Sequence, residues 1–270
     1  MKKLIIVSLV VLMAVLPAAC TTPAAPQAAP TTIKIGVNIG NIPWEFNEGS
    51  QLTGFEIDML NEICKRMNAK PEYVNVPFSG IFAGLLSSKW DIAASSIFIK
   101  KERAAQMDFA DPYYDSDISL MVRKDSTMKV FEDMKGKTFG ADTGTVNDAW
   151  LKDNVGKYGP YQIKGYDRPT DAFLDLEAGR LDGVVGDAPT TLYYAKDKPT
   201  LDVRFLMGSA FKQAVAFRKG DALRDKYNTV QNDLKKDGTL AKIYKKWFGK
   251  DPAPDSSTVK IYTTPYVPQQ

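Results

Sequence analysis

The sequence contains no histidine and only two cysteines among its 270 residues. The missing histidine excludes Ser-His-Asp and Cys-His catalysis and removes the commonest metal-ligating side chain. Two cysteines cannot form a thiolate zinc site. We therefore expect no metal and no other cofactor, and the composition favours a binding protein over an enzyme.

The N-terminus lacks an apolar run long enough to cross a bilayer. The run from Leu4 to Val15 is shorter than the ~20 apolar residues that a membrane-spanning helix requires. Lys2 and Lys3 precede this run, and the small residues Pro17-Ala18-Ala19 follow it, which is the layout of an export signal. We interpret residues 1–19 as a signal peptide and expect the mature protein outside the cytoplasm.

Cys20 directly follows this small-residue segment. The arrangement resembles a bacterial lipoprotein processing site, where the cysteine is acylated, although Pro17 stands where that pattern usually has leucine. Ordinary cleavage near Ala19 is the alternative. Residues 21–30 are only Thr, Pro, Ala and Gln, which cannot bury a core and favour an extended chain. We predict lipidation at Cys20 and a membrane-anchored tether over residues 20–31.

A strong charge excess is also missing, because 35 basic residues stand against 32 acidic ones. Removal of the signal takes away two lysines and no acid, so the formal charge falls from +3 to +1. The attraction that supplies non-specific nucleic-acid binding is therefore absent, and we expect no nucleic-acid partner.

Short apolar runs alternate with helical patterns, which predicts parallel sheets covered by helices. Cys64 falls in one such pattern with Phe55, Leu60 and Ile63 on the apolar side, which predicts a buried structural thiol. Ser79 is predicted to cap a second helix. The first series has strands at 32–37, 73–76 and 90–94 and helices at 55–67 and 79–88. The second has strands at 138–141, 161–163 and 182–185 and helices from 146 and at 170–178.

The chain continues through Gln213–Phe217 into two more predicted helices, one stopped by Gly238 and one ending at Trp247-Phe248-Gly249. No internal repeat is present. Residues 251–270 contain four prolines and little periodicity, which predicts an extended tail.

A series of motifs runs along the chain from about Thr32 to Gly249. Together they resemble the polar amino-acid branch of bacterial periplasmic solute-binding proteins. The motifs are Pro43-Trp44-Glu45-Phe46, Leu52-Thr53-Gly54-Phe55-Glu56-Ile57-Asp58, Val76-Pro77-Phe78-Ser79-Gly80, Lys101-Glu102-Arg103 through Asp108-Phe109-Ala110-Asp111-Pro112-Tyr113-Tyr114, Lys135-Gly136-Lys137, Gly144-Thr145, Leu181-Asp182-Gly183-Val184-Val185-Gly186-Asp187 and Lys246-Trp247-Phe248-Gly249.

The resemblance implies an α/β fold of two lobes, the type II periplasmic-binding-protein fold, with a sheet flanked by helices in each lobe. It implies lobe 1 over residues 32–116 and 210–250, lobe 2 over residues 117–209, and a hinge of two segments near Tyr114–Ile118 and Met207–Ala214. The implied protein is a monomer that binds an amino acid and delivers it to an ABC permease in the membrane.

A free amino acid is a zwitterion, so its site must offer a cation to the carboxylate and an anion to the ammonium. Arg103 aligns with the family's carboxylate-binding arginine; without the resemblance, Lys100–Arg103 would read as a solvated charge run. Asp187 aligns with the ammonium-binding aspartate, and helix capping is its alternative role. Gly144-Thr145-Val146 lies between a predicted strand and a predicted helix, where unpaired N–H groups could receive the carboxylate, although Gly and Thr at such a turn are as often simple capping residues.

Other positions follow from the same resemblance. Phe78 matches an aromatic wall, with core packing as the alternative, and Ser95 and Ser96 match positions that hold the ammonium and the side chain of the ligand. Asn38 and Asn41 stand where relatives often have an aspartate and an aromatic residue. Phe98 and Val146 lack hydroxyl groups that many relatives have there, which moves carboxylate binding toward Arg103 and backbone N–H groups.

Asp142 occupies a position where relatives touch the far end of the ligand. With the amide of Asn38 and the rings of Phe78, Phe98 and Trp44, it favours a polar or cationic amino acid such as arginine, lysine or glutamine over an acidic one. The alternative is that Asp142 only caps the following helix and faces solvent.

Two other classes of function use this fold. Some members are exported cyclohexadienyl dehydratases, which place a longer glutamate where this chain has Asp187. Others are sensor modules fused to a receptor, which the absence of a membrane span at the end of this chain disfavours.

Overall fold

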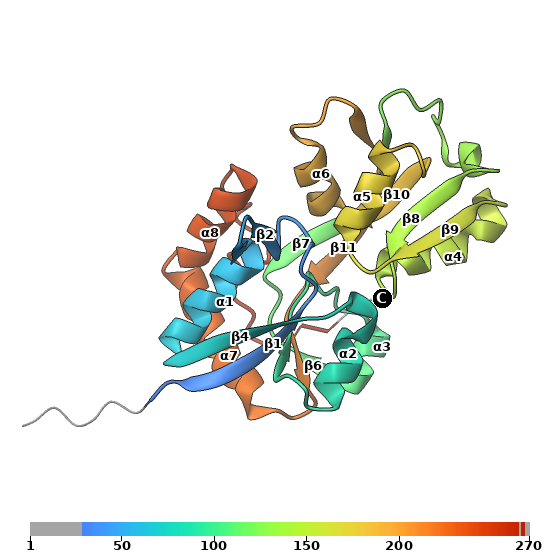
Figure 1. The fold of residues 1–270 in the computed structure, drawn as a ribbon. Helices are drawn as coiled ribbons and strands as arrows, with labels where there is room; N and C mark the ends of the chain where they lie inside the picture. The colour runs from blue at the N-terminus through green and yellow to red at the C-terminus, as the bar shows by residue number, and fades with distance from the viewer. Residues whose placement is uncertain (1–28, 265, 268–270) are drawn as a thin grey trace, which may run out of the picture.

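Two five-stranded sheets form the cores of two lobes in the computed structural model, which describes residues 29–264, 266 and 267 (Figure 1). Lobe 1 contains the first strand and the last two helices, and lobe 2 contains the middle of the chain (Figure 1). The predicted signal peptide at 1–19, Cys20 and most of the predicted tether lie outside the described residues.

Lobe 1 is built on the strand order β4-β1-β5-β12-β6. Strand β1 pairs in parallel with β4 and β5, whereas β12 is antiparallel to both β5 and β6. A small hairpin, β2–β3, lies beside this sheet. The elements are β1 Thr31–Val37, β2 Phe46–Glu48, β3 Gln51–Thr53, α1 Phe55–Arg66, β4 Ala69–Asn75, α2 Phe78–Leu86, β5 Ile92–Ala93, α3 Lys101–Gln106, β6 Met107–Phe109, β12 Ala216–Arg218, α7 Ala222–Lys236 and α8 Thr239–Phe248.

Lobe 2 has the strand order β11-β7-β10-β8-β9. Strand β8 pairs in parallel with β9 and β10, and β7 is antiparallel to β10 and β11. The predicted parallel pairing is therefore found for three strands of each sheet, and the other two strands of each sheet form antiparallel pairs. The antiparallel pairs arise where the chain passes between the lobes along β7 and β11 and where it returns to lobe 1 at β12. The elements are β7 Tyr114–Arg123, the 3₁₀ helix η1 Phe131–Met134, β8 Thr138–Asp142, α4 Val146–Tyr158, β9 Gln162–Tyr166, α5 Pro169–Glu177, β10 Gly183–Asp187, α6 Ala188–Ala195 and β11 Leu201–Gln213.

Helix α1 shows how the apolar pattern becomes the core of lobe 1. Its residues Phe55, Leu60, Ile63 and Cys64 are buried in one cluster with the sheet and with α7 and α8. Burial raises the pKa of the Cys64 thiol to about 11, which keeps it protonated and unreactive at neutral pH. The predicted buried structural thiol is confirmed.

Helix α2 begins one residue earlier than expected. Its N-cap is Pro77, and Ser79 is an exposed residue of the first turn, so the prediction that Ser79 caps this helix is wrong. The ring of Phe78 is buried against Ile81 and Leu85 in a local cluster, which draws Phe78 into the first turn.

Strands β7 and β11 connect the two lobes (Figure 1). They pair from Tyr114 with Gln213 onward, and their register shifts between Met207 and Phe211. The two segments predicted as a hinge fall on this paired stretch. The lobe boundaries predicted at residues 116/117 and 209/210 also fall inside these two strands.

The tail after α8 is packed against the rest of the protein around Ser257 and Thr258, within the part that the structure describes. Ser257 and Thr258 are buried. The Ser257 N–H donates to Asp115 at 2.7 Å, Lys212 contacts the same carboxylate at 2.5 Å, and the Thr258 hydroxyl donates to the Tyr113 carbonyl at 2.9 Å. Because Asp115 and Lys212 lie on β7 and β11, the tail holds the start of the inter-lobe connection.

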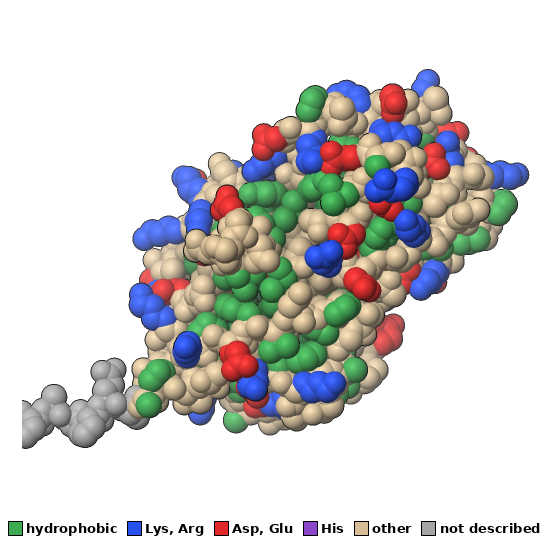
Figure 2. Space-filling view, viewed as in Figure 1, with side chains coloured by type: hydrophobic (Ala, Val, Ile, Leu, Met, Phe, Trp, Pro, Cys, Tyr) green, Lys and Arg blue, Asp and Glu red, His purple; other side chains and the backbone are tan. Residues whose placement is uncertain are grey.

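No helix within residues 29–264, 266 and 267 is long and apolar enough to span a membrane. Charged side chains cover the outer surfaces of both lobes, and apolar side chains gather across the middle of the face that Figure 2 shows.

Candidate functional site

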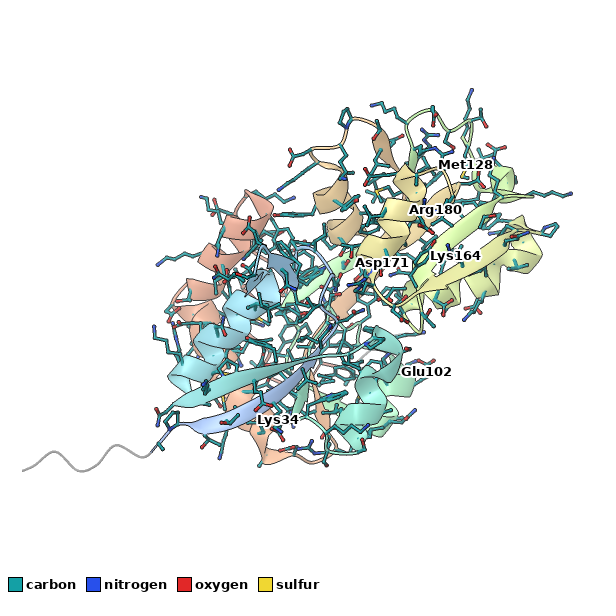
Figure 3. The ribbon with its side chains drawn as sticks, viewed as in Figure 1. Lys34, Glu102, Met128, Lys164, Asp171 and Arg180 are labelled. Atoms are coloured by element: carbon teal, nitrogen blue, oxygen red, sulfur yellow. The ribbon has the colours of Figure 1, made fainter. Side chains whose placement is uncertain are left out.

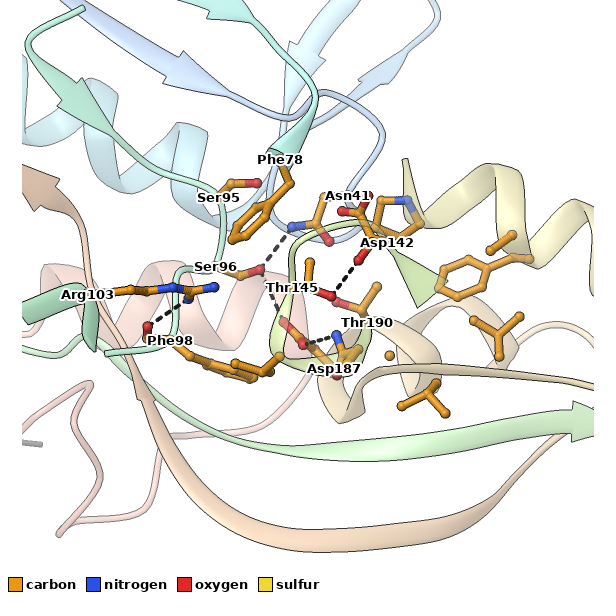
Figure 4. A pocket seen from close by; sticks show the side chains of 18 residues that line it. Asn41, Phe78, Ser95, Ser96, Phe98, Arg103, Asp142, Thr145, Asp187 and Thr190 are labelled. Carbon is orange, nitrogen blue, oxygen red and sulfur yellow. Dashed lines mark hydrogen bonds between the residues drawn. The ribbon is translucent and has the colours of Figure 1, made fainter. Parts of the chain in front are cut away.

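A cavity lies between the two lobes, lined from lobe 1 by α2, α3 and the segment after β5, and from lobe 2 by β10 and the amino ends of α4, α5 and α6 (Figure 4). Ten of the twelve residues predicted to bind a ligand line it: Asn41, Phe78, Ser95, Ser96, Phe98, Arg103, Asp142, Thr145, Val146 and Asp187. The structure thus brings them together, and their contacts with a ligand stay a prediction.

Arg103 of α3 directs its guanidinium into the cavity (Figure 4). The group donates to the carbonyl of Phe98 at 3.0 Å and to that of Gly144 in lobe 2 at 3.4 Å. It lies 5.4 Å from the centre of the Phe78 ring, which supports cation–π attraction. Burial lowers the pKa of Arg103 to about 10, partly offset by Asp187, so the group stays cationic at neutral pH.

The side chains next to Arg103 in the sequence point to solvent and not into the cavity. Lys101 and Glu102 are exposed, and Glu102 lies on the outer surface of lobe 1 (Figure 3). The alternative interpretation, a run of solvated charges, therefore holds for Lys101 and Glu102 but is wrong for Arg103.

Asp187, at the end of β10, supplies a carboxylate on the opposite wall. It accepts hydrogen bonds from Asn147 at 2.8 Å, from the Ser96 hydroxyl at 3.2 Å and from Gln213 at 3.3 Å. It stands at the N-cap position of α6, but its side chain makes no capping bond, so the capping alternative is wrong. Burial raises the pKa of Asp187 to about 6, and the carboxylate is mostly ionised at neutral pH.

Thr145 caps α4, because its hydroxyl accepts from the Asp148 N–H and donates to the Asp142 carbonyl at 2.6 Å. The Gly144 N–H already donates to the Asp148 carboxylate at 3.0 Å. The Thr145 N–H donates to the Asp142 carbonyl at 3.3 Å. Of the predicted backbone donors in lobe 2, this leaves Val146, the first helical residue, whose N–H has no partner inside the helix.

Asp142 is buried at the end of β8, with 7% of its surface exposed. One carboxylate oxygen accepts from the Asn38 amide of lobe 1 at 3.1 Å. The other, Oδ1, is buried and has no hydrogen-bond partner in the part of the chain that the structure describes. Since Thr145 caps the helix and Asp142 does not face solvent, the capping alternative is wrong here too. Burial, followed by the carboxylates of Asp187 and Asp167, raises the pKa of Asp142 to about 8.

Two predicted residues do not line the cavity. Trp44 is fully buried in the lobe 1 core, edge-on to Phe55 and Tyr114, and its indole N–H donates to Thr190 of lobe 2 at 2.9 Å. A ring that large is held by its aromatic neighbours, so the placement of Trp44 in the pocket is wrong. Asn38 lies behind Asp142 and also donates to the Asp167 carbonyl at 3.0 Å. Both side chains connect the lobes.

The sequence did not reveal eight further lining residues. Asn147 and Thr190 lie in the first turns of α4 and α6. Their closeness in sequence to the predicted residues Val146 and Asp187 was the only available signal. The others form an apolar end of the cavity, and their patterns read as packing against a sheet. They are Pro169, Ala172, Phe173, Val184, Val185 and Gly186.

The free volume between these side chains is about 30 Å³. That is room for about two water molecules and far less than any amino acid needs. Direct bonds such as Trp44 to Thr190 and Asn38 to Asp142 hold the lobes together across the gap. A ligand of amino-acid size can therefore enter only if the lobes separate and the side chains rearrange.

Residues 33–250 match the family model described as bacterial extracellular solute-binding proteins, family 3. The chain belongs to this family. It is 32% identical to the ABC transporter arginine-binding protein 1 of Escherichia coli K12, over 82% of this chain and 92% of that protein. It is 31% identical to the L-cystine-binding protein TcyJ of the same strain, over 82% and 84% of the two chains.

The solved structure of an ancestral arginine-binding protein bound to arginine has a TM-score of 0.77 and 34% identity to this solute-binding protein, covering 82% of this chain and all of that one. The predicted family and the predicted two-lobe type II fold are confirmed. The protein is thus the extracytoplasmic component of an ABC transporter that binds an amino acid between its lobes.

Proposed function

We propose that this solute-binding protein selects a cationic amino acid, with arginine as the leading candidate. The observation that carries the proposal is the buried Oδ1 atom of Asp142, which lines the cavity and has no hydrogen-bond partner among the described residues. A buried carboxylate oxygen without a donor is costly, so a ligand that supplies one is favoured.

The charges around the cavity support the same ligand class. The α-carboxylate of an amino acid would pair with Arg103, and its ammonium with Asp187. Each of these two ion pairs is neutral in itself, so Asp142 is left without a counter-charge. A guanidinium or alkyl-ammonium side chain supplies that charge, whereas the side chain of glutamate would place a second carboxylate beside Asp142.

The residues that line the cavity agree with a long side chain. Phe173 and Pro169 of α5 and Val184 of β10 form apolar surface that could cover methylene groups on the way to Asp142. Two relatives, an arginine-binding protein and an ancestral arginine-binding protein bound to arginine, support the same class.

We expect arginine affinity to rise with pH. Asp142 has a raised pKa of about 8 and binds a cation only when ionised, so arginine binding releases a proton below that pH. Calorimetry between about pH 6 and about pH 8 should show a Kd that falls as pH rises, with an enthalpy that depends on the buffer. Tight binding of glutamate, or a Kd for arginine that grows toward pH 8, would count against the proposal.

We also propose that the protein binds its ligand without chemical conversion. The two acids of the cavity are each held by amide donors, Asp142 by Asn38 and Asp187 by Asn147. The sequence has no histidine to act as a general base. The dehydratases of the same fold use a glutamate where this chain has the shorter Asp187.

Cys20 is the proposed lipid anchor, in a protein that acts as a monomer. The support is its place directly after a small-residue cleavage segment and before a segment of Thr, Pro, Ala and Gln. Cys20→Ala should release the protein from the membrane fraction, because one residue carries the acyl chains. If the variant remains as firmly bound as the parent after a salt wash, the anchor lies elsewhere.

A further inference from the structure

Two glutamates lie beneath the cavity in the core of lobe 1. Glu45, in the loop before β2, and Glu56, in the first turn of α1, are both 0% exposed. Within the part of the chain that the structure describes, neither of them belongs to an ion pair with lysine or arginine. A buried acid without a counter-charge calls for a physical account.

Both glutamates hold residues that line the cavity. One oxygen of Glu45, Oε1, accepts from the amide of Asn41 at 3.1 Å and from the hydroxyl of Ser95 at 2.5 Å. Glu56 accepts from the Ser96 N–H at 2.9 Å and from the Tyr113 hydroxyl. The second oxygen of Glu45, Oε2, is buried and receives no hydrogen bond from a donor among the described residues. The Glu45 side chain lies within hydrogen-bonding reach of the Glu56 carboxyl group. Two fully buried carboxyl groups without a counter-cation can form a hydrogen bond with each other only if one of them keeps a proton.

We propose that Glu45 carries this proton and donates it to Glu56, and that the pair positions Asn41, Ser95 and Ser96 for ligand binding. Glu56 is the acceptor because it already receives two other donors, which favour its ionised form. The inference rests on amino-acid binding by the cleft and is independent of which amino acid is selected.

The groups around the pair favour a retained proton. The titratable side chains that act on it are Tyr113, Tyr227 of α7, Tyr73 of β4 and Asp187 across the cavity, all of them acids. Burial raises the pKa of Glu45 well above its usual value of 4.5, and the charge of Glu56 adds to this. Burial also raises the pKa of Glu56, while its hydrogen bonds oppose the rise.

Ser96 shows why positioning is needed. Its φ of 43° lies in the left-handed region, which a serine adopts only at an energetic cost. Its N–H is held by Glu56, and its hydroxyl accepts from Asn41 at 3.0 Å and donates to Asp187 (Figure 4). The glutamate pair thus holds a strained residue that contacts the proposed ammonium-binding aspartate.

Two conservative variants distinguish the partners. In Glu45→Gln, the new amide keeps an acceptor for Asn41 and Ser95 and donates permanently to Glu56, which mimics protonated Glu45. In Glu56→Gln, one oxygen becomes an amide NH₂ that faces the Ser96 N–H or the Tyr113 hydroxyl, both of which donate in the parent. An NH₂ that faces the Ser96 N–H loses that bond. One that faces Tyr113 makes the hydroxyl turn to accept, which leaves the hydroxyl hydrogen without its Glu56 acceptor.

The first measurement needs no ligand. A raised folded-state pKa means that stability present below about pH 4.5 is lost as the pH rises toward that folded-state value. The melting temperature of Glu45→Gln minus that of the parent should therefore increase from about pH 5 to about pH 8, because glutamine has no proton to lose. Parallel pH profiles for the two proteins would overturn the shared proton.

The second measurement is calorimetric titration with arginine. Glu56→Gln should raise the Kd by about tenfold or more, whereas Glu45→Gln should bind several-fold more tightly than Glu56→Gln at every pH. Equal losses in the two variants, or no loss in Glu56→Gln, would overturn the positioning role. If the parent itself fails to bind arginine, the proposed ligand is wrong, and the melting profiles still decide the glutamate pair.

Discussion

Replacing Arg103 with alanine is expected to weaken amino-acid binding by about 2–5 kcal/mol, which is roughly 30-fold to 5,000-fold in Kd. The guanidinium is the one basic group among the described residues that line the cavity. Its loss would leave a desolvated ligand carboxylate without a counter-charge. The bonds from Arg103 to the carbonyls of Phe98 and Gly144 would be lost as well.

Two further variants make this test specific. Arg103→Lys keeps the charge but loses the bidentate fork, so its affinity should fall between those of the parent and the alanine variant. Glu102→Ala changes the exposed neighbour on the same helix and should bind like the parent. Near-parental affinity of Arg103→Ala in calorimetry, with its melting temperature preserved, would remove Arg103 from the site.

Most elements were predictable because their burial follows simple periods. The apolar face of α1 and the alternation of strands and helices appear directly in the sequence. The direction of the returning strands was not predictable, since β7, β11 and β12 depend on pairing between segments far apart in the chain. The packing of Ser257 and Thr258 against Asp115 and Tyr113 is likewise a tertiary contact without a local pattern.

The residues of the candidate site were likewise predictable only in part. Residues within recognisable motifs, such as Arg103 and Asp187, line the cavity as expected. Trp44 belongs to a motif as well, but the aromatic core around it decides its position. Phe173 and Val184 were missed because the apolar pattern in the sequence is the same in two cases. It does not distinguish a residue that packs against a sheet from one that lines a cavity beside the sheet.

Asp142→Asn is expected to reverse the preference for a charged ligand. The new amide oxygen would accept from Asn38, as one oxygen of Asp142 now does at 3.1 Å, and its NH₂ group would face the cavity. A guanidinium brings only donors to that position, whereas a ureido or amide oxygen accepts from it. Arginine should lose about 1.5–3 kcal/mol of binding free energy, roughly 10-fold to 150-fold in Kd, and citrulline should be affected far less.

The most direct test of the account is one calorimetric comparison of arginine with citrulline, an uncharged ligand of nearly the same shape, in the parent and in Asp142→Asn. We predict that the parent binds arginine at least about tenfold more tightly than citrulline and that the variant loses or inverts this ratio. Equal affinity of the parent for the two ligands, or a ratio that Asp142→Asn leaves unchanged, would contradict the claim that Asp142 selects a cationic amino acid.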